Sequence, residues 1–175
     1  GWISMTPFDL IRSSRLSVEE RQWLSGGALD ADLLRHPAPP VLPEDVREIR
    51  WLRFAGRPLA LLQGAKTSQL IALDADEPAF PALSLADIRA RAAGLLPQAR
   101  IRTADWLEEP DSEYFPRRHR ALTLPVVRIR FDDANQTVYY ITPANGSVVR
   151  KIDAPGRRYR WLFGALHRFD FPPLN

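Results

Sequence analysis

The three histidines of this chain, His36, His119 and His167, limit any histidine-based chemistry to three positions. Only His167 has a second donor at helical spacing, because Asp170 follows three residues later. Pro172 ends that stretch soon afterwards, whereas a metal site needs three or four converging donors. We therefore expect no metal site and no catalytic histidine.

Clustered carboxylates are the second candidate for chemistry. Five acidic residues fall between Asp105 and Glu113, and paired carboxylates can perform acid–base catalysis. The basic run 117–120 follows at once. We interpret the two runs as loops that neutralise each other, an exposed arrangement worth about 0 to 1 kcal/mol per pair. An enzyme would instead need a deep pocket that gathers Asp105, Glu108 or Asp111 with His119.

Other catalytic patterns are missing from the sequence. There is no glycine-rich phosphate loop, no serine elbow and no His-Glu-x-x-His motif. The chain has no cysteine, which excludes disulfides and thiol nucleophiles. Its formal net charge of +3 is too small to indicate a nucleic-acid binder. We expect no catalytic residue and no nucleic-acid partner.

The last 20 residues combine cations with aromatic rings. Three arginines precede an aromatic and aliphatic stretch within about one helical turn, a pattern that fits lipid phosphates and the bilayer interface. Two alternatives are base stacking in a nucleic-acid binder and simple packing of the helix on its own sheet. At the other end, residues 1–8 carry aromatic rings that fit a membrane boundary or an ordinary terminal strand. The residues expected to contact a membrane or partner are Trp2, Phe8, Arg157, Arg158, Arg160, Trp161, Phe163, His167, Arg168, Phe169 and Asp170.

No apolar run in this sequence approaches the roughly 18 to 20 residues that a membrane helix requires, and none follows a basic stretch in the pattern of a signal peptide. The aromatic ends nevertheless favour a segment that lies between two membrane spans of a larger protein.

In the first half, Ser17 and Glu20 have the spacing of a capping box, which predicts a short helix over residues 18–24. Glycines at 26 and 27 end it, and a proline-rich connector follows over 35–43. Residues 46–73 alternate as three short strands with turns at 55–58 and 64–67. Ser84 then caps a helix that should end between Gly94 and Pro97.

In the second half, four extended stretches are predicted at 99–106, 122–131, 137–141 and 147–152. Arg128 and Arg130 alternate with Val127 and Ile129, the period of a half-buried antiparallel strand. The order resembles the first half and suggests an internal duplication.

The order of several motifs resembles that of bacterial PepSY-associated transmembrane proteins. The similarity is close over 111–171 and loose from 46 onward. It rests on Asp111–Phe115, His119, Leu124–Asp132, Tyr139–Gly146 and Arg160–Phe171. Thr142 and Asn145 depart from the Asp and Thr that the family usually has.

The resemblance implies an α+β fold of two PepSY-like modules, each an antiparallel sheet of about three strands with a packed helix. The expected divisions are a membrane-proximal segment (1–45), two modules (46–97 and 98–153) and a membrane-proximal helix (154–175). The resemblance also implies that this segment lies at the periplasmic face of the inner membrane.

Some family members resemble ferric-siderophore reductases. Haem would then be held in the membrane part of the parent, with His167 the one candidate ligand here, and this segment would bind no cofactor. The expected partners are the parent's membrane helices and the membrane surface. The expected function is non-catalytic binding or regulation beside the membrane. The alternative is a peptidase-inhibitory or chaperone-like module that binds an extended peptide at a sheet edge.

Overall fold

The computed structural model describes residues 16–25, 44–74, 79–116 and 122–168, with side chains as far as Leu162 except those of Gln22 and Ser25. The predicted α+β class is confirmed, since two antiparallel sheets of three and four strands are combined with a few helices. None of the described helices is both long enough and apolar enough to cross a membrane.

The first sheet is the meander that the sequence predicts. It consists of β1 (Val46–Phe54), β2 (Arg57–Gly64) and β3 (Ser68–Ala72), paired in chain order. Ala55 and Gly56 form the first turn with φ values of 54° and 84°, a region that glycine adopts at low cost. The turn before β3 is closed by a hydrogen bond from the Gly64 amide to the Thr67 carbonyl (2.8 Å).

The second sheet has four strands, which match the four extended stretches predicted in the second half and exceed by one the sheet of about three strands that the resemblance implies. Its order is β4 (Ile101–Leu107), β5 (Val126–Phe131), β6 (Val138–Ile141) and β7 (Val148–Ile152). The strand β4 pairs with β5 along its whole length, from Ile101 to Leu107. It therefore adds an edge strand to the three-strand series of β5, β6 and β7.

Two short helices begin at the caps that the sequence predicts. In α2 (Val18–Ser25), the Glu20 amide donates to Ser17 Oγ (3.1 Å) and the Ser17 amide donates to Glu20 Oε2 (2.8 Å), which is a complete capping box. In α3 (Leu85–Ala92), Ser84 Oγ accepts from the Asp87 amide (3.1 Å). A 3₁₀ turn, η2 (Ala93–Leu95), completes α3 within the predicted limits.

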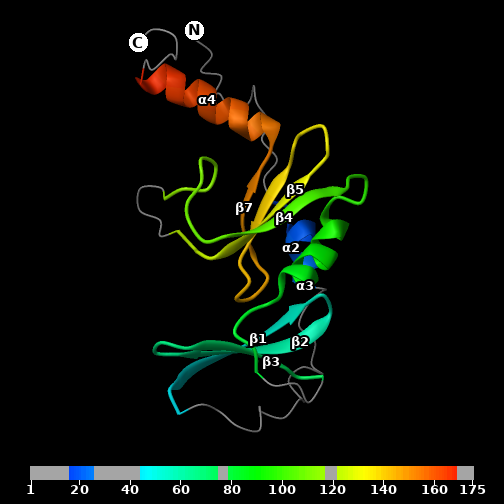
Figure 1. The fold of residues 1–175 in the computed structure, drawn as a ribbon, viewed down its shortest axis with the longest axis vertical. Helices are drawn as coiled ribbons and strands as arrows, with labels where there is room; N and C mark the ends of the chain where they lie inside the picture. The colour runs from blue at the N-terminus through cyan, green and yellow to red at the C-terminus, as the bar shows by residue number, and fades with distance from the viewer. Residues whose placement is uncertain (1–15, 26–43, 75–78, 117–121, 169–175) are drawn as a thin grey trace, which may run out of the picture.

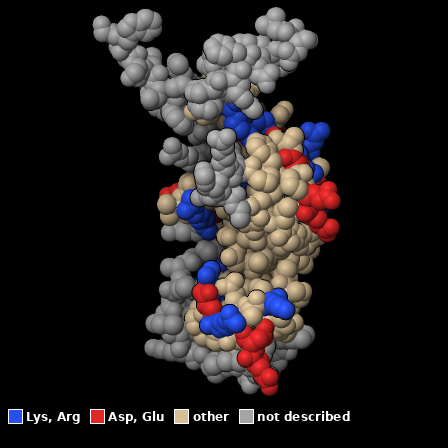
Figure 2. Space-filling view, turned by 90° about the vertical axis from the view of Figure 1, so that its left-hand side faces the viewer, with Lys and Arg blue, Asp and Glu red and all other residues tan. Residues whose placement is uncertain are grey.

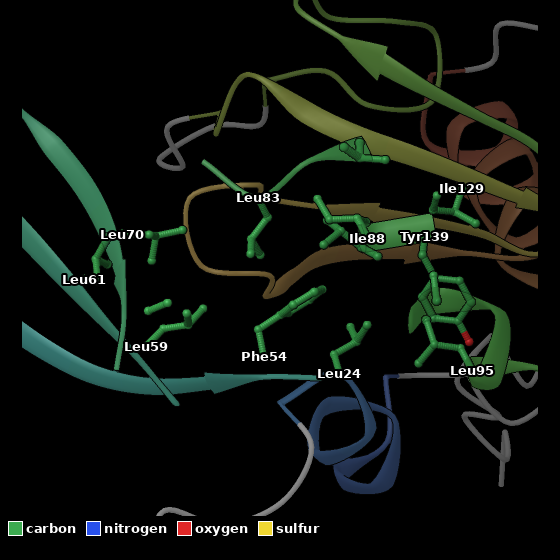
Figure 3. Close-up of a cluster of buried hydrophobic side chains, with 14 of the residues drawn as sticks. Leu24, Phe54, Leu59, Leu61, Leu70, Leu83, Ile88, Leu95, Ile129 and Tyr139 are labelled. Atoms are coloured by element: carbon green, nitrogen blue, oxygen red, sulfur yellow. The ribbon is translucent and has the colours of Figure 1, made fainter. Parts of the chain in front are cut away.

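One hydrophobic core joins both sheets and both short helices. Leu24 from α2, Leu61 from the first sheet, Ile88 from α3 and Ile129 from the second sheet all belong to it (Figure 3). The helix α3 packs on β4 and β5 of the second sheet, so the predicted boundary at residue 97 separates this helix from strands that it contacts. The division into two PepSY-like modules stays a prediction.

The helix α4 (Ala154–Arg168) follows β7 directly. It starts where the Asp153 carboxylate accepts from the Gly156 amide (2.8 Å), an ordinary N-cap interaction. Asp153 is buried, and the Ala154 amide is held by the Asn135 carbonyl (2.7 Å). Figure 1 shows α4 at the end of the molecule opposite the first sheet, extending beyond the strand from which it leaves.

Candidate interface at the base of α4

One row of side chains crosses all four strands on the outer face of the second sheet. The strand register places Asp105 beside Arg128, Arg128 beside Tyr140, and Tyr140 beside Arg150. These positions face away from the main core because strand side chains alternate between the two faces. The row therefore forms a polar track from the β4 edge to the β7 edge.

The acidic segment after β4 lies over this track. Arg128 bonds Asp105 Oδ2 through Nη2 (2.6 Å) and Asp111 Oδ2 through Nη1 (2.8 Å). Burial raises the pKa of Asp111, but the Tyr114 and Glu113 amides and the Arg128 guanidinium lower it more, so that this carboxyl's pKa lies below its usual value. Asp111 is thus held as a carboxylate at neutral pH.

Tyr114 fixes the next part of the segment by aromatic packing. Its ring is buried and stacks on Tyr140 at a centroid distance of 4.6 Å, and its hydroxyl donates to the Thr123 carbonyl (2.8 Å). The Arg150 guanidinium lies 5.0 Å from the Tyr114 ring centroid, a cation–π distance. Burial raises the pKa of the Tyr140 hydroxyl, so it stays protonated.

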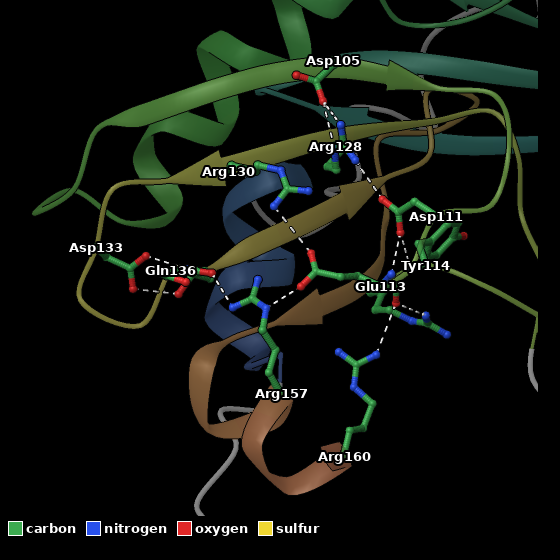
Figure 4. Close-up of polar contacts among 12 residues, drawn as sticks. Asp105, Asp111, Glu113, Tyr114, Arg128, Arg130, Asp133, Gln136, Arg157 and Arg160 are labelled. Atoms are coloured by element: carbon green, nitrogen blue, oxygen red, sulfur yellow. Dashed lines mark hydrogen bonds and ion pairs between the residues drawn. The ribbon is translucent and has the colours of Figure 1, made fainter. Parts of the chain in front are cut away.

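Glu113 joins the segment to α4 (Figure 4). Its carboxylate pairs with Arg157 Nε and lies 3.6 Å from Arg130 Nη1. Its carbonyl accepts from Arg150 (2.8 Å) and, at longer range, from Arg160 (3.3 Å). Only 19% of its side chain is exposed, so these contacts are partly shielded from water. Four arginines from two strands and one helix therefore converge on one residue.

The predicted interface residues on α4 divide into two groups. Arg157 and Arg160 turn back to Glu113, and Arg157 also donates to the Gln136 carbonyl (2.9 Å). Arg158 is exposed, and Trp161 is 59% exposed. The base of α4 thus packs on its own sheet, while another side of the helix faces outward.

Part of the predicted set cannot be placed. Trp2, Phe8, Phe169 and Asp170 lie outside the described residues. Phe163, His167 and Arg168 lie within α4, but their side chains are outside the described part of the chain. The basic run 117–120 and His36 are also outside it.

The acidic segment has partners that sequence reasoning missed. In the described part of the chain, its carboxylates pair with arginines of β5 and α4. We expected the adjacent run 117–120 to supply these partners, and that run lies outside the described residues. The alternation of Arg128 and Arg130 with apolar residues could have indicated these partners. Cations on the polar face of a half-buried strand need acidic neighbours when a loop covers them.

A second ionic cluster lies on the inner face and attaches α2. Lys151 Nζ lies 2.5 Å from Glu20 Oε1, which also accepts from the Tyr139 hydroxyl (2.5 Å). The Glu20 and Lys151 side chains are only 14% and 10% exposed. The Lys151 ammonium also lies 5.4 Å from the Tyr139 ring centroid. The neighbours Arg150 and Lys151 thus serve opposite faces of β7.

The site's chemistry is that of charge pairing. Within the described ranges, no three His, Asp or Glu side chains are grouped to hold a metal, and the described side chains include no histidine, methionine or cysteine that would ligate haem iron. The expectation that this segment binds no cofactor stays a prediction. The enzyme hypothesis required His119, which is not described, and the expectation of no catalytic site stays a prediction.

Charge is unevenly distributed over the surface. Figure 2 shows basic residues both near the end that carries α4 and near the opposite end of this face, acidic residues at the right-hand side and near the bottom, and a wide uncharged area between the two ends.

No family model, curated protein or solved structure matches this chain. The resemblance to PepSY-associated proteins therefore stays a prediction.

Proposed function

We propose that this chain is a non-catalytic, PepSY-like domain of a bacterial membrane protein, positioned at the periplasmic face of the inner membrane by α4. In this role it binds or regulates a partner beside the membrane. The observation that carries the proposal is the two-sided character of α4: one side is fixed to the second sheet, and the other presents a cation and a large aromatic ring.

The composition of α4 supports attraction to an anionic surface. It contains four arginines, at 157, 158, 160 and 168, and no acidic residue. A helix with arginines and an exposed tryptophan is typical of segments that lie at the bilayer interface, where guanidinium groups meet phosphates and the indole ring occupies the headgroup region.

Packing of α4 on its own domain explains only part of the helix. It accounts for Arg157 and Arg160, whose guanidinium groups are bonded to Glu113 and Gln136. It does not account for Trp161, whose exposed apolar surface is costly in water. The membrane proposal explains both sides, because a fixed base gives the exposed side a defined direction.

The test is sedimentation of the chain with vesicles of phosphatidylglycerol and phosphatidylethanolamine. Burial of an exposed tryptophan contributes about 1.5 to 3 kcal/mol, so Trp161→Ala should lower the partition coefficient about 10- to 150-fold. Trp106→Ala is the matched control, because Trp106 is also exposed (42%) but lies on β4, at the other edge of the sheet from β7 and α4. Equal effects of the two substitutions, or no binding by the unmodified chain, would contradict the proposal.

The reductase part of the resemblance has a separate test. If the parent carries haem with His167 as a ligand, His167→Ala in the full-length protein should reduce its haem content. Normal haem content would remove His167 from that role and leave the interfacial role of α4 unaffected.

A peptide-binding module is the second candidate, and β4 is the observation that favours it. This seven-residue strand ends the four-strand sheet, and among the described strands none pairs with its outer edge. An extended peptide could add there as a fifth strand, beside the exposed Trp106 ring. Linear peptides selected for binding to this chain should no longer bind the Ala104→Pro variant, and that result would support this function. If the chain inhibits a co-encoded peptidase and Ala104→Pro inhibits it equally well, the β4 edge is excluded as the binding site.

A further inference from the structure

Phe115 is an exposed aromatic residue at the end of a firmly held segment. Its side chain is 39% exposed, whereas the preceding residue, Tyr114, is 3% exposed. The stacking of Tyr114 on Tyr140 and the contacts of Glu113 leave little freedom to the backbone just before Phe115. Its exposure is therefore a defined feature of the surface.

The path of the segment places Phe115 beside α4. The segment crosses the sheet strand by strand: Asp111 meets Arg128 on β5, Tyr114 meets Tyr140 on β6, and Phe115 lies 6.0 Å from the guanidinium of Arg150 on β7. The strand β7 leads directly into α4. Phe115 therefore lies at the β7 end of the polar track, and α4 begins directly after β7.

A shared contact links Phe115 to Trp161 more closely. The Glu113 carbonyl, two residues before Phe115, accepts from Arg160, the residue next to Trp161. The two exposed rings thus belong to segments that are hydrogen-bonded to each other.

We propose that Phe115 is a second anchor in the anionic lipid surface that α4 contacts. This inference rests on the proposed function. Two anchors on separate segments would fix both the distance and the tilt of the domain relative to the bilayer. With α4 as its one anchor, the domain would be free to rotate about the axis of that helix.

The charges around Phe115 are compatible with an anionic surface. The nearest carboxylate of its own segment, Glu113, is paired with Arg157, and Asp111 is paired with Arg128. The exposed acids Glu108 and Glu109 lie at the start of the segment, next to the end of β4, on the far side of the track. Arg150 adds a cation between the Tyr114 and Phe115 rings.

The absence of cysteine from the sequence allows a direct test. Single variants Phe115→Cys, Trp161→Cys and Lys66→Cys are labelled with an environment-sensitive fluorophore and mixed with phosphatidylglycerol-containing vesicles or phosphatidylcholine vesicles. Lys66 is the control, because it lies in the β2–β3 turn of the sheet opposite α4 (Figure 1). The expected result is a blue shift and quenching by spin-labelled lipid at 115 and 161, on anionic vesicles only, and neither at 66.

The outcomes separate the two proposals. A response at 161 without one at 115 overturns the second anchor and keeps the proposed function, whereas no response at 161 overturns both. A blue shift at 115 without lipid quenching would mean burial against protein and would also overturn the second anchor. In unlabelled protein, Phe115→Ala should lower the partition coefficient about five- to thirtyfold with an unchanged circular dichroism spectrum, and Phe115→Trp should retain it.

Discussion

Replacing Glu20 with glutamine should destabilise the chain by about 2 to 4 kcal/mol. Glutamine keeps the size of the side chain and can still complete the capping box. It removes the negative charge that Lys151 faces at 2.5 Å, in a pair whose side chains are 14% and 10% exposed. Loss of one partner from a fully buried pair costs about 3 to 5 kcal/mol, and the remaining exposure reduces this value.

The measurement is urea unfolding followed by circular dichroism, with thermal unfolding as a second readout. For a chain of this length, about 2 to 4 kcal/mol corresponds to a fall in Tm of about 4 to 16 °C. Lys151→Met and the double variant complete a double-mutant cycle. Because the double variant leaves no unpaired charge, it should be more stable than the sum of the single losses predicts.

The pH dependence follows from the pKa of Glu20. Burial raises this pKa, but hydrogen bonds from Lys151 and Tyr139, the Ser17 amide and the Lys151 charge lower it below its usual value. A lowered pKa in the folded state stabilises the protein above the unfolded-state pKa of about 4.3, and the stabilisation is lost as pH falls through the folded value. The difference between the original chain and Glu20→Gln should be constant between pH 6 and 8 and shrink below about pH 4.3. This account would be refuted if the stability losses of the two single variants were additive in the double variant. It would also be refuted if the stability difference between the original chain and Glu20→Gln stayed the same below about pH 4.3.

Two further predictions concern buried positions. Gly146→Ala should cost about 2 to 4 kcal/mol in urea unfolding, because φ is 71° and an added Cβ would lie 2.2 Å from Phe54 Cδ2; a loss below 0.5 kcal/mol would show that the turn relaxes freely. Tyr140→Phe should change stability by less than about 0.5 kcal/mol, since within the described residues its hydroxyl has no hydrogen-bond partner, whereas Tyr139→Phe should cost about 1.5 to 3 kcal/mol for its bond to a carboxylate. The reverse order in the same assay would contradict this assignment.

Local sequence patterns predicted the elements well. Ser17 with Glu20, and Ser84 with its helix, were recognisable because capping is completed within one helical turn. The alternation around Arg128 predicted which face of β5 is polar for a similar reason, since it depends only on the strand period.

Contacts between distant segments were not predictable in the same way. Nothing near Glu20 indicates that its carboxylate meets Lys151, because that pairing depends on how α2 packs on the second sheet. For the same reason, Glu113 was read as part of a solvated loop, although it holds the base of α4. Sequence proximity favoured residues 117–120 as partners, whereas the described partners of this segment lie on β5 and α4.

Trp161 was included in the candidate interface on the basis of its residue type and its position after three arginines. Trp161 is exposed, but the sequence did not distinguish it from Arg157 and Arg160, which turn inward to Glu113. That distinction depends on the direction in which α4 leaves β7. Phe115 carried no sequence signal beyond its type.

The opposite orientations of Arg150 and Lys151 on β7 restrict how the length of the chain can vary. A single residue inserted or deleted in the turn between β6 and β7 would exchange the faces of these two cations, since strand side chains alternate. Arg150 would leave the Tyr114 and Glu113 contacts, and Lys151 would leave Glu20. Apart from Gly146, relatives of this chain should therefore tolerate substitutions in that turn more readily than changes in its length, and a relative with one extra residue there should carry a compensating bulge.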